Sequence, residues 1–80
     1  MIEWHRFQAY WLRLSAISLI GEVFVDGKAK CAGVRIVCGA NDSKFLRRCS
    51  PEETVHDCMV ALTRDVCDLK DACGVPYERD

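Results

Sequence analysis

The sequence lacks a surplus of positive charge and has no long apolar run. Its 11 lysines and arginines are matched by 12 aspartates and glutamates, which gives a net charge of −1. Nucleic-acid-binding domains usually carry a basic excess, so the composition disfavours that class and leaves room only for a local basic patch. No charge-free apolar stretch approaches about 18 residues, so we expect no transmembrane helix and no membrane partner.

Histidine is scarce, which limits the catalytic options. The two histidines, His5 and His56, have no serine, cysteine or carboxylate neighbour at a spacing that marks a catalytic pair. Cys58 follows His56 by two residues and therefore projects from a different side of a helix. We expect a protein that is not an enzyme and that uses no cofactor.

Closely spaced cysteine pairs are also missing, although the chain has 6 cysteines. No Cys-x-x-Cys is present, and zinc sites typically take paired ligands from tight turns, so no metal site is expected. The cysteines lie at positions 31, 38, 49, 58, 67 and 73.

The redox state of these cysteines separates two hypotheses. They lie inside apolar patterns, and the first residues lack the basic region, apolar stretch and cleavage site of a signal peptide. These features favour buried free thiols in a cytoplasmic protein. A secreted effector stapled by disulfides remains the alternative, because an even number of cysteines in a short chain also fits a disulfide framework.

Asp26-Gly27 separates two apolar-alternating runs and predicts a β-hairpin with a two-residue loop. The strands are expected over residues 17–25 and 28–38, with Val25 opposite Lys28. In this register the apolar residues of both runs share one face of the sheet. Those residues are Ile17, Leu19, Val23 and Val25 before the loop, and Val34, Ile36 and Cys38 after it.

The most regular segment of the chain predicts a long C-terminal helix. Ser50 is placed to cap it, Pro51 suits the first helical position, and Glu53 completes a capping box. Gly74 and Pro76 are placed to end it. Its apolar stripe consists of Val55, Cys58, Met59, Leu62, Val66, Leu69 and Cys73.

The N-terminal segment, residues 2–15, carries large apolar side chains at spacings of three and four, which predicts an amphipathic helix. Arg6 and Arg13 lie together on the flank of that helix. The apolar residues are Trp4, Phe7, Tyr10, Trp11, Leu14 and Ile17. The simplest interpretation packs them on the sheet, and the alternative leaves some exposed as anchors for a binding partner.

These elements predict an α+β fold with the order α-β-β-β-α. A turn at residues 39–43 and a third strand at 44–49 complete a three-stranded antiparallel meander, which packs against the long C-terminal helix. Residues 1–76 are expected to form a single small domain, and residues 77–80 a polar tail.

Acidic residues on one side of the C-terminal helix point to a protein partner. They are Asp57, Asp65, Asp68 and Asp71. Val60 and Cys67 form a small apolar strip on the same helix, which fits a partner groove or a homodimer contact. The expected function is a protein-interaction module that occludes a surface of a larger partner. Phage-encoded inhibitors of host defence, such as anti-CRISPR proteins, are similar in size and character.

Nucleic-acid binding is the alternative function. The predicted order of elements resembles that of double-stranded-RNA-binding domains, which carry lysines at the start of their second helix. Glu52 and Glu53 occupy that place here, so the resemblance brings no functional residue to this chain. The alternative assigns nucleic-acid contact to Lys44, Arg47 and Arg48 on the third strand, whose simpler interpretation is a charged edge that discourages strand addition.

Overall fold

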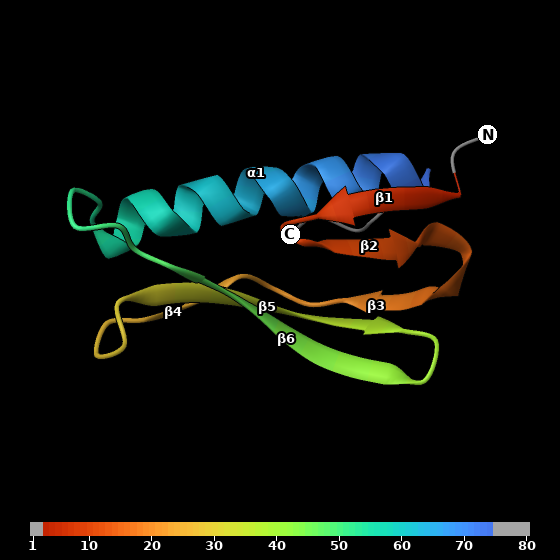
Figure 1. The fold of residues 1–80 in the computed structure, drawn as a ribbon, viewed down its shortest axis with the longest axis horizontal. Coiled ribbons are helices and arrows are strands. Elements are labelled where there is room, and N and C mark those ends of the chain that lie inside the picture. Colours follow the sequence, from red (N-terminus) through yellow and green to blue (C-terminus); the bar gives the residue numbers. More distant parts are fainter. Residues whose placement is uncertain (1–2, 75–80) are drawn as a thin grey trace.

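The computed structural model describes residues 3–74 of the chain. A long helix packs on one face of an antiparallel sheet, and a separate two-stranded hairpin lies beside the helix at one end (Figure 1). The elements are β1 (Trp4–Phe7), β2 (Tyr10–Arg13), the 3₁₀ helix η1 (Leu14–Ala16), β3 (Ile17–Ile20), β4 (Phe24–Asp26), β5 (Cys31–Cys38), β6 (Asn41–Arg48) and α1 (Val55–Cys73). The predicted α+β class and the C-terminal helix packed on a meander are confirmed. The predicted tail, residues 77–80, lies outside the described residues.

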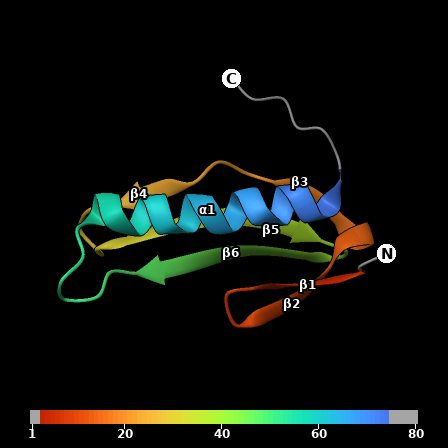
Figure 2. The same cartoon turned by 90° about the horizontal axis from the view of Figure 1, so that it is seen from above.

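The main sheet is a meander built around β5. β6 pairs with the full length of β5 on one side, while β3 and β4 pair in turn with the two ends of β5 on the other side. β3 and β4 therefore act as one interrupted strand, which gives the predicted three-stranded arrangement. Seen from above, the N-terminal hairpin lies on the β6 side of the sheet (Figure 2).

The loop at Asp26-Gly27 is longer than predicted. Val25 lies opposite Ala32 instead of Lys28, so residues 27–30 connect the strands. The Asp26 carboxylate accepts hydrogen bonds from the backbone N–H groups of Lys28 (3.0 Å) and Ala29 (3.1 Å), which closes the turn through a side chain. The shift of four residues is even, so Val25 keeps the side of the sheet that the prediction gave it.

A bulge in β3 changes the face of one predicted core residue. Ile17 lies opposite Cys38, but the register shifts before Leu19, which then lies opposite Val37. Ile20 takes the position opposite Ile36 and packs against the core. Leu19 was predicted on the core face and is instead 40% exposed, because a one-residue shift moves a side chain to the other face.

The third strand begins earlier than predicted. Cys38 lies opposite Asn41, so Gly39-Ala40 alone forms the loop and residues 41–43 belong to β6. Gly39 has a φ of 62°, which glycine adopts without steric cost and which suits a tight hairpin loop. The two-residue hairpin loop of this sheet therefore lies here and not at Asp26-Gly27.

The helix predicted over residues 2–15 is replaced by the β1–β2 hairpin. Phe7 lies opposite Tyr10, and Gln8-Ala9 forms the loop, with Gln8 at a φ of 56°. Aromatic and β-branched side chains favour strands when they pack across a strand pair, and this tertiary packing outweighs the helical spacing. The order of elements consequently differs from the one that suggested a double-stranded-RNA-binding domain.

The N-cap of the C-terminal helix lies four residues later than predicted. Thr54 is the N-cap: its hydroxyl accepts from the N–H of Asp57 (3.1 Å), whose carboxylate accepts from the N–H of Thr54 (3.2 Å). Ser50 and Glu53 bond to each other in the preceding turn instead, because the Glu53 carboxylate accepts from the N–H of Ser50 (3.0 Å). Gly74 ends the helix as predicted, at a φ of 66°.

The core lies between α1 and the sheet. The buried helix residues Cys58, Leu62, Val66 and Leu69 belong to one cluster with Ala32, Val34, Ile36 and Phe45 of the sheet. Phe7 and Leu12 of the hairpin join this cluster. Full burial of one such leucine or phenylalanine stabilises the folded state by roughly 1.5–3 kcal/mol, so the hairpin is attached to the body by an appreciable apolar contact.

Candidate functional site

The two faces of the β1–β2 hairpin differ in burial. Phe7 and Leu12 are 1% and 8% exposed on the inner face, where the Phe7 and Tyr10 rings each meet Phe45 edge-on, with centroids 5.3 Å apart. Side chains alternate along each strand, so the register places Trp4, Arg6, Trp11 and Arg13 on the other face. The inner face therefore anchors the hairpin and the outer face is left for solvent.

The outer face of the hairpin alternates tryptophan and arginine. Trp4 lies opposite Arg13 and Trp11 lies opposite Arg6, so each strand contributes one residue of each kind. Trp4 is 53% exposed and Trp11 is 62% exposed. We call these four residues the aromatic–arginine face. Solvent-exposed tryptophan and arginine side chains are the types most enriched at the energetic centres of protein interfaces.

Local hydrogen bonds order this face. Arg13 Nε donates to Glu3 Oε1 (2.8 Å) and the Ser15 hydroxyl donates to the same oxygen (2.5 Å). Arg6 Nε donates to the carbonyl of Gln8 (3.0 Å). The bond from Ser15, followed by that from Arg13, holds the pKa of the Glu3 carboxyl below its usual value. The Nε atom of each guanidinium is thus held by a neighbouring group.

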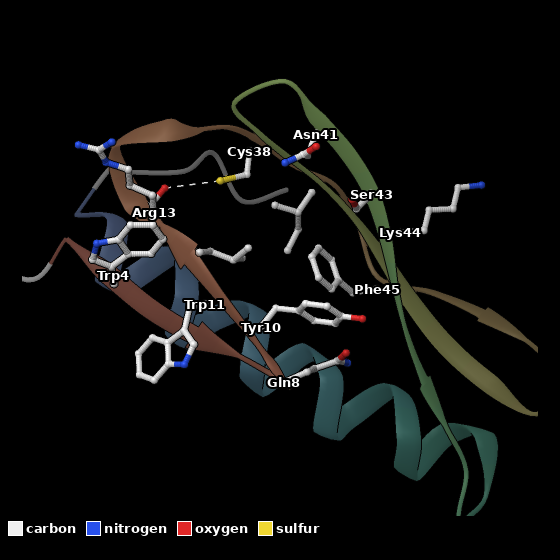
Figure 3. Close-up of a pocket in the computed structure, with 12 residues that line it drawn as sticks. Trp4, Gln8, Tyr10, Trp11, Arg13, Cys38, Asn41, Ser43, Lys44 and Phe45 are labelled. Carbon is white, nitrogen blue, oxygen red and sulfur yellow. Dashed lines mark hydrogen bonds between the residues drawn. The ribbon is translucent and has the colours of Figure 1, made fainter.

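A cavity of about 500 Å³ opens between β2 and the end of the sheet formed by β5 and β6. Figure 3 shows Tyr10 and Trp11 of β2 on one side of it and Asn41, Ser43 and Phe45 of β6 on the other. Its lining residues are Trp4, Gln8, Tyr10, Trp11, Leu12, Arg13, Ile36, Cys38, Asn41, Ser43, Lys44 and Phe45. A cavity of this size, with mostly apolar walls and a few polar groups, is typical of a binding site.

A second cavity of about 300 Å³ lies between the hairpin and the helix. Its walls bring Asp65 and Asp68 of α1 together with His5 and Arg6 of β1. Two of the predicted acidic partner-binding residues therefore border the hairpin. The negative charge of the helix lies next to the positive charge of the aromatic–arginine face.

The other predicted partner-binding residues are spread along α1. Asp57 forms the capping box with Thr54, so its carboxylate serves the start of the helix. Asp71 is exposed near the end of the helix, Val60 is 37% exposed, and Cys67 is half-buried. The structure does not bring these four residues together with Asp65 and Asp68 into one compact site.

The predicted basic cluster is divided between the two faces of β6. Lys44 and Arg48 are exposed, whereas Arg47 points toward the helix and holds Glu53 through two bonds, Nη1–Oε1 (3.0 Å) and Nη2–Oε2 (3.1 Å). Arg47 also donates to Cys58 Sγ (3.3 Å). Its guanidinium lowers the pKa of Glu53 to about 2. Arg47 thus joins β6 to the helix and is not positioned for phosphate contact.

The face of the sheet opposite α1 carries a smaller apolar patch. Phe24 and Leu46 lie on either side of Gly33, where a Cβ atom would come within 2.4 Å of the Phe24 ring and 2.7 Å of Leu46. The glycine therefore lets the two side chains close over β5. Arg35 and Asp42 form an exposed ion pair (2.7 Å) on the same face, which leaves the apolar patch small.

The Cys49 thiol, next to the end of β6, is expected to be a weak nucleophile. All six cysteines are free, and burial followed by a hydrogen bond with Cys58 raises the pKa of the Cys49 thiol. A raised pKa lowers the fraction of nucleophilic thiolate at neutral pH. Among residues 3–74, no three histidine, cysteine or acidic side chains are grouped to hold a metal ion. Within the same range, no helix has the length and apolar content to span a bilayer.

The aromatic–arginine face was not assigned from the sequence as a site, although exposed aromatic anchors were considered as an alternative. The signal that could have found it is the pairing Trp4–Arg13 and Arg6–Trp11, which is visible only once a loop at Gln8-Ala9 is assumed. Comparisons of the chain with protein-family models, with curated proteins and with solved structures give no match.

Proposed function

We propose that the protein is a non-enzymatic interaction module that occludes a surface of a larger protein through its aromatic–arginine face. The single observation that supports this most is the exposure of two tryptophans, 53% and 62%, on an ordered strand pair. A folded domain of this size has few large apolar side chains, and exposing two of them on one face has no benefit for its own core.

The energetics of this face fit a hot spot. Truncating a hot-spot residue at a protein interface typically costs 2 kcal/mol or more of binding free energy, roughly 30-fold in affinity. The backbone of Trp4 and Trp11 is held by the strand pairing, so the segment does not have to be ordered when a partner covers it. Asp65 and Asp68, beside the face, would favour a partner whose own surface presents both charge signs in complementary positions.

The proposed setting is the cytoplasm, and free thiols support it because a reducing compartment keeps cysteines unpaired. An inhibitor that acts by covering a partner's working surface, of the anti-CRISPR-like kind, would use a face of this type. The same face could be turned toward a second copy of the chain, and the capture experiment below distinguishes that case by the identity of the protein retained.

Single-stranded nucleic acid is the second candidate, because exposed aromatic rings beside cations also stack on bases. Two observations count against it. Glu3 neutralises Arg13, while Asp65 and Asp68 border Arg6. Phosphates would therefore meet carboxylates at each side of the face. Arg47, one of the three cations that the sequence offered for phosphate contact, is committed to Glu53.

The test is comparative capture from a lysate of the source cells, with and without nuclease. The wild-type protein should retain a partner protein that survives nuclease treatment, and both Trp11→Ala and Arg6→Glu should lose it. Leu46→Ala is the matched control, because Leu46 is a large apolar residue of similar exposure, 53%, on the opposite side of the sheet.

Three outcomes overturn the proposal. The first is a set of retained proteins that is the same for Trp11→Ala and the wild type. The second is the loss of every retained protein after nuclease treatment, which would indicate that the protein binds nucleic acid. The third is retention that depends on Leu46 as strongly as on Trp11.

A further inference from the structure

The outer edge of β6 is free for most of its length. β6 pairs with β5 over all eight of its residues, and no other strand of residues 3–74 pairs with it. The tight loop makes Cys38 and Asn41 a hydrogen-bonded pair, and such pairs recur at every second residue of an antiparallel ladder. The bond from the N–H of Cys49 to the carbonyl of Lys30 (2.9 Å) is in phase with this pattern.

This phase fixes which backbone groups of β6 point outward. They are the N–H and C=O groups of the intervening residues, Asp42, Lys44, Leu46 and Arg48. A free row of this kind is a template for an added strand. Its charged side chains discourage indiscriminate pairing and leave the edge open to a strand of the complementary charge.

The 500 Å³ cavity adjoins this edge. β2 forms its opposite wall and pairs with β1 alone among the described strands. At the other edge of β2 the Arg13 carbonyl accepts a hydrogen bond from Cys38 Sγ (3.6 Å, Figure 3). The floor is apolar and is formed by Leu12, Ile36 and Phe45. The groove between β2 and β6 therefore combines unpaired backbone, an apolar floor and an open side.

The charged side chains lie at the rim of the groove. Figure 3 shows Lys44 and Arg13 pointing away from the cavity, and Glu3 pairs with Arg13. On the Lys44 face of β6, Asp42 pairs with Arg35, which leaves Lys44 and Arg48 as the cations that an added strand would meet. Gln8, Asn41 and Ser43 add neutral hydrogen-bonding groups. A segment with alternating acidic and apolar side chains matches these walls, because residues on one face of a strand would meet the floor and those on the other the cations.

We propose that the groove between β2 and β6 binds an extended acidic peptide segment of the partner as an added strand along β6. This inference rests on the proposed function, since it names the part of the partner that the protein grips. Main-chain hydrogen bonds to Asp42 and Lys44 hold the segment, an apolar side chain enters beside Tyr10 and Phe45, and a carboxylate meets Lys44.

A peptide fits this groove better than a nucleic acid does. Backbone N–H and C=O groups in a free row recognise another peptide backbone, whereas phosphates have no donors to return to the carbonyls. Along this edge of β6 only Lys44 and Arg48 offer positive charge, since Glu53 already holds Arg47. Affinity for a phosphate chain grows with the number of free cations, which is small here.

Selection from a displayed library of random ten-residue peptides on the immobilised full-length protein tests the proposal. We expect acidic sequences with alternating apolar residues to be enriched. Lys44→Glu should weaken the best synthetic peptide at least tenfold, measured by fluorescence anisotropy. Arg64→Glu is the matched control and should change the affinity less than threefold, because Arg64 is an exposed cation of α1 that neither lines the cavity nor belongs to β6.

N-methylation of the peptide backbone distinguishes strand addition from simple contact. Methyl groups on one alternate set of amides should abolish binding, while methyl groups on the other set should be tolerated, because only every second N–H faces β6. Enrichment of basic or featureless sequences, tolerance of both methylated sets, or equal losses from Lys44→Glu and Arg64→Glu would overturn the proposal. Tighter binding of a labelled ten-nucleotide oligouridine than of any peptide would do so too.

Failure here is separable from failure of the proposed function. Arg6 belongs to the aromatic–arginine face but does not line the 500 Å³ cavity, whereas Lys44 lines the cavity but is not part of that face. A partner whose capture depends on Arg6 and not on Lys44 keeps the proposed function and rejects the groove. A peptide that depends on Lys44, together with captured proteins indifferent to Arg6 and Trp11, keeps the groove and rejects the face.

Discussion

The body formed by β3–β6 and α1 and the hairpin formed by β1 and β2 use their large side chains in opposite ways. In the body, Leu62 and Leu69 are fully buried between helix and sheet. In the hairpin, Trp4 and Trp11 are more than half exposed and only Phe7 and Leu12 reach the core. The comparison indicates that the body carries the stability of the fold while the hairpin displays a surface.

The largest expected effect comes from the body. Leu62 is 0% exposed at the centre of the helix–sheet contact. Leu62→Ala should lower the free energy of unfolding by about 2–5 kcal/mol, because it removes buried methyl groups and leaves a cavity. Urea denaturation followed by circular dichroism measures this. A loss below about 1 kcal/mol would mean that the helix–sheet contact is not the main source of stability.

The Arg47–Glu53 pair should make the stability of the body sensitive to acid. The pKa of Glu53 falls from an ordinary value of 4.5 to about 2 in the folded state, so its contribution is complete above pH 4.5 and is lost as the pH falls toward 2. Glu53→Gln should lower the urea concentration at the midpoint of unfolding at neutral pH. It should also make the loss of stability between pH 4.5 and pH 2 less steep.

Glu52→Gln is the control for this measurement, since it removes the same charge one residue away and leaves the two bonds of Arg47 in place. An unchanged acid profile in Glu53→Gln, or an equal change in Glu52→Gln, would contradict the role given to the Arg47–Glu53 pair.

Variants at the start of α1 should have a smaller effect on stability, and they distinguish the observed cap, Thr54, from the predicted cap, Ser50. Thr54→Ala should destabilise the protein by about 1 kcal/mol, because it removes the acceptor that caps the N–H of Asp57. Ser50→Ala should cost clearly less, since the Ser50 side chain makes no capping bond to α1. Thermal unfolding of the two variants side by side decides the matter, and the reverse order would restore Ser50 as the cap.

The body could be predicted from the sequence because its patterns have one structural meaning. The stripe from Cys58 to Leu69 repeats with a helical period over several turns, and no sheet could bury it. The apolar alternation of β5 similarly required a strand. The loop was misjudged because the Asp26 side chain can close a longer turn, while Gly39 supplied the tight one.

The hairpin could not be predicted because its spacing suits two structures. Trp4 and Trp11, seven residues apart, share a face on a helix and also across this hairpin, and the same holds for Phe7 and Tyr10. The two structures differ in whether Phe7 and Tyr10 lie on the same face as the tryptophans. The residue that settles it is Gln8, whose positive φ is uncommon for a non-glycine residue and has no sequence signal.

The candidate site was missed for the same reason. Reading the segment as a helix put its aromatic residues on one face with Arg6 and Arg13 at the flank, so no face combined exposed tryptophan with arginine. The acidic residues of α1 were recognisable, but that Asp65 and Asp68 border the hairpin depends on tertiary packing. Arg47 was assigned to the surface because its partner, Glu53, lies beyond the end of the strand.

The most direct test of the difference between body and hairpin is partner capture by the Trp4→Ala, Trp11→Ala double variant, at a concentration of folded protein verified by urea denaturation. We predict that capture falls at least 30-fold while the free energy of unfolding changes by less than about 1 kcal/mol. Retained capture, or a loss of stability as large as that of Leu62→Ala, would contradict the account, because the tryptophans would then serve the fold and not a partner.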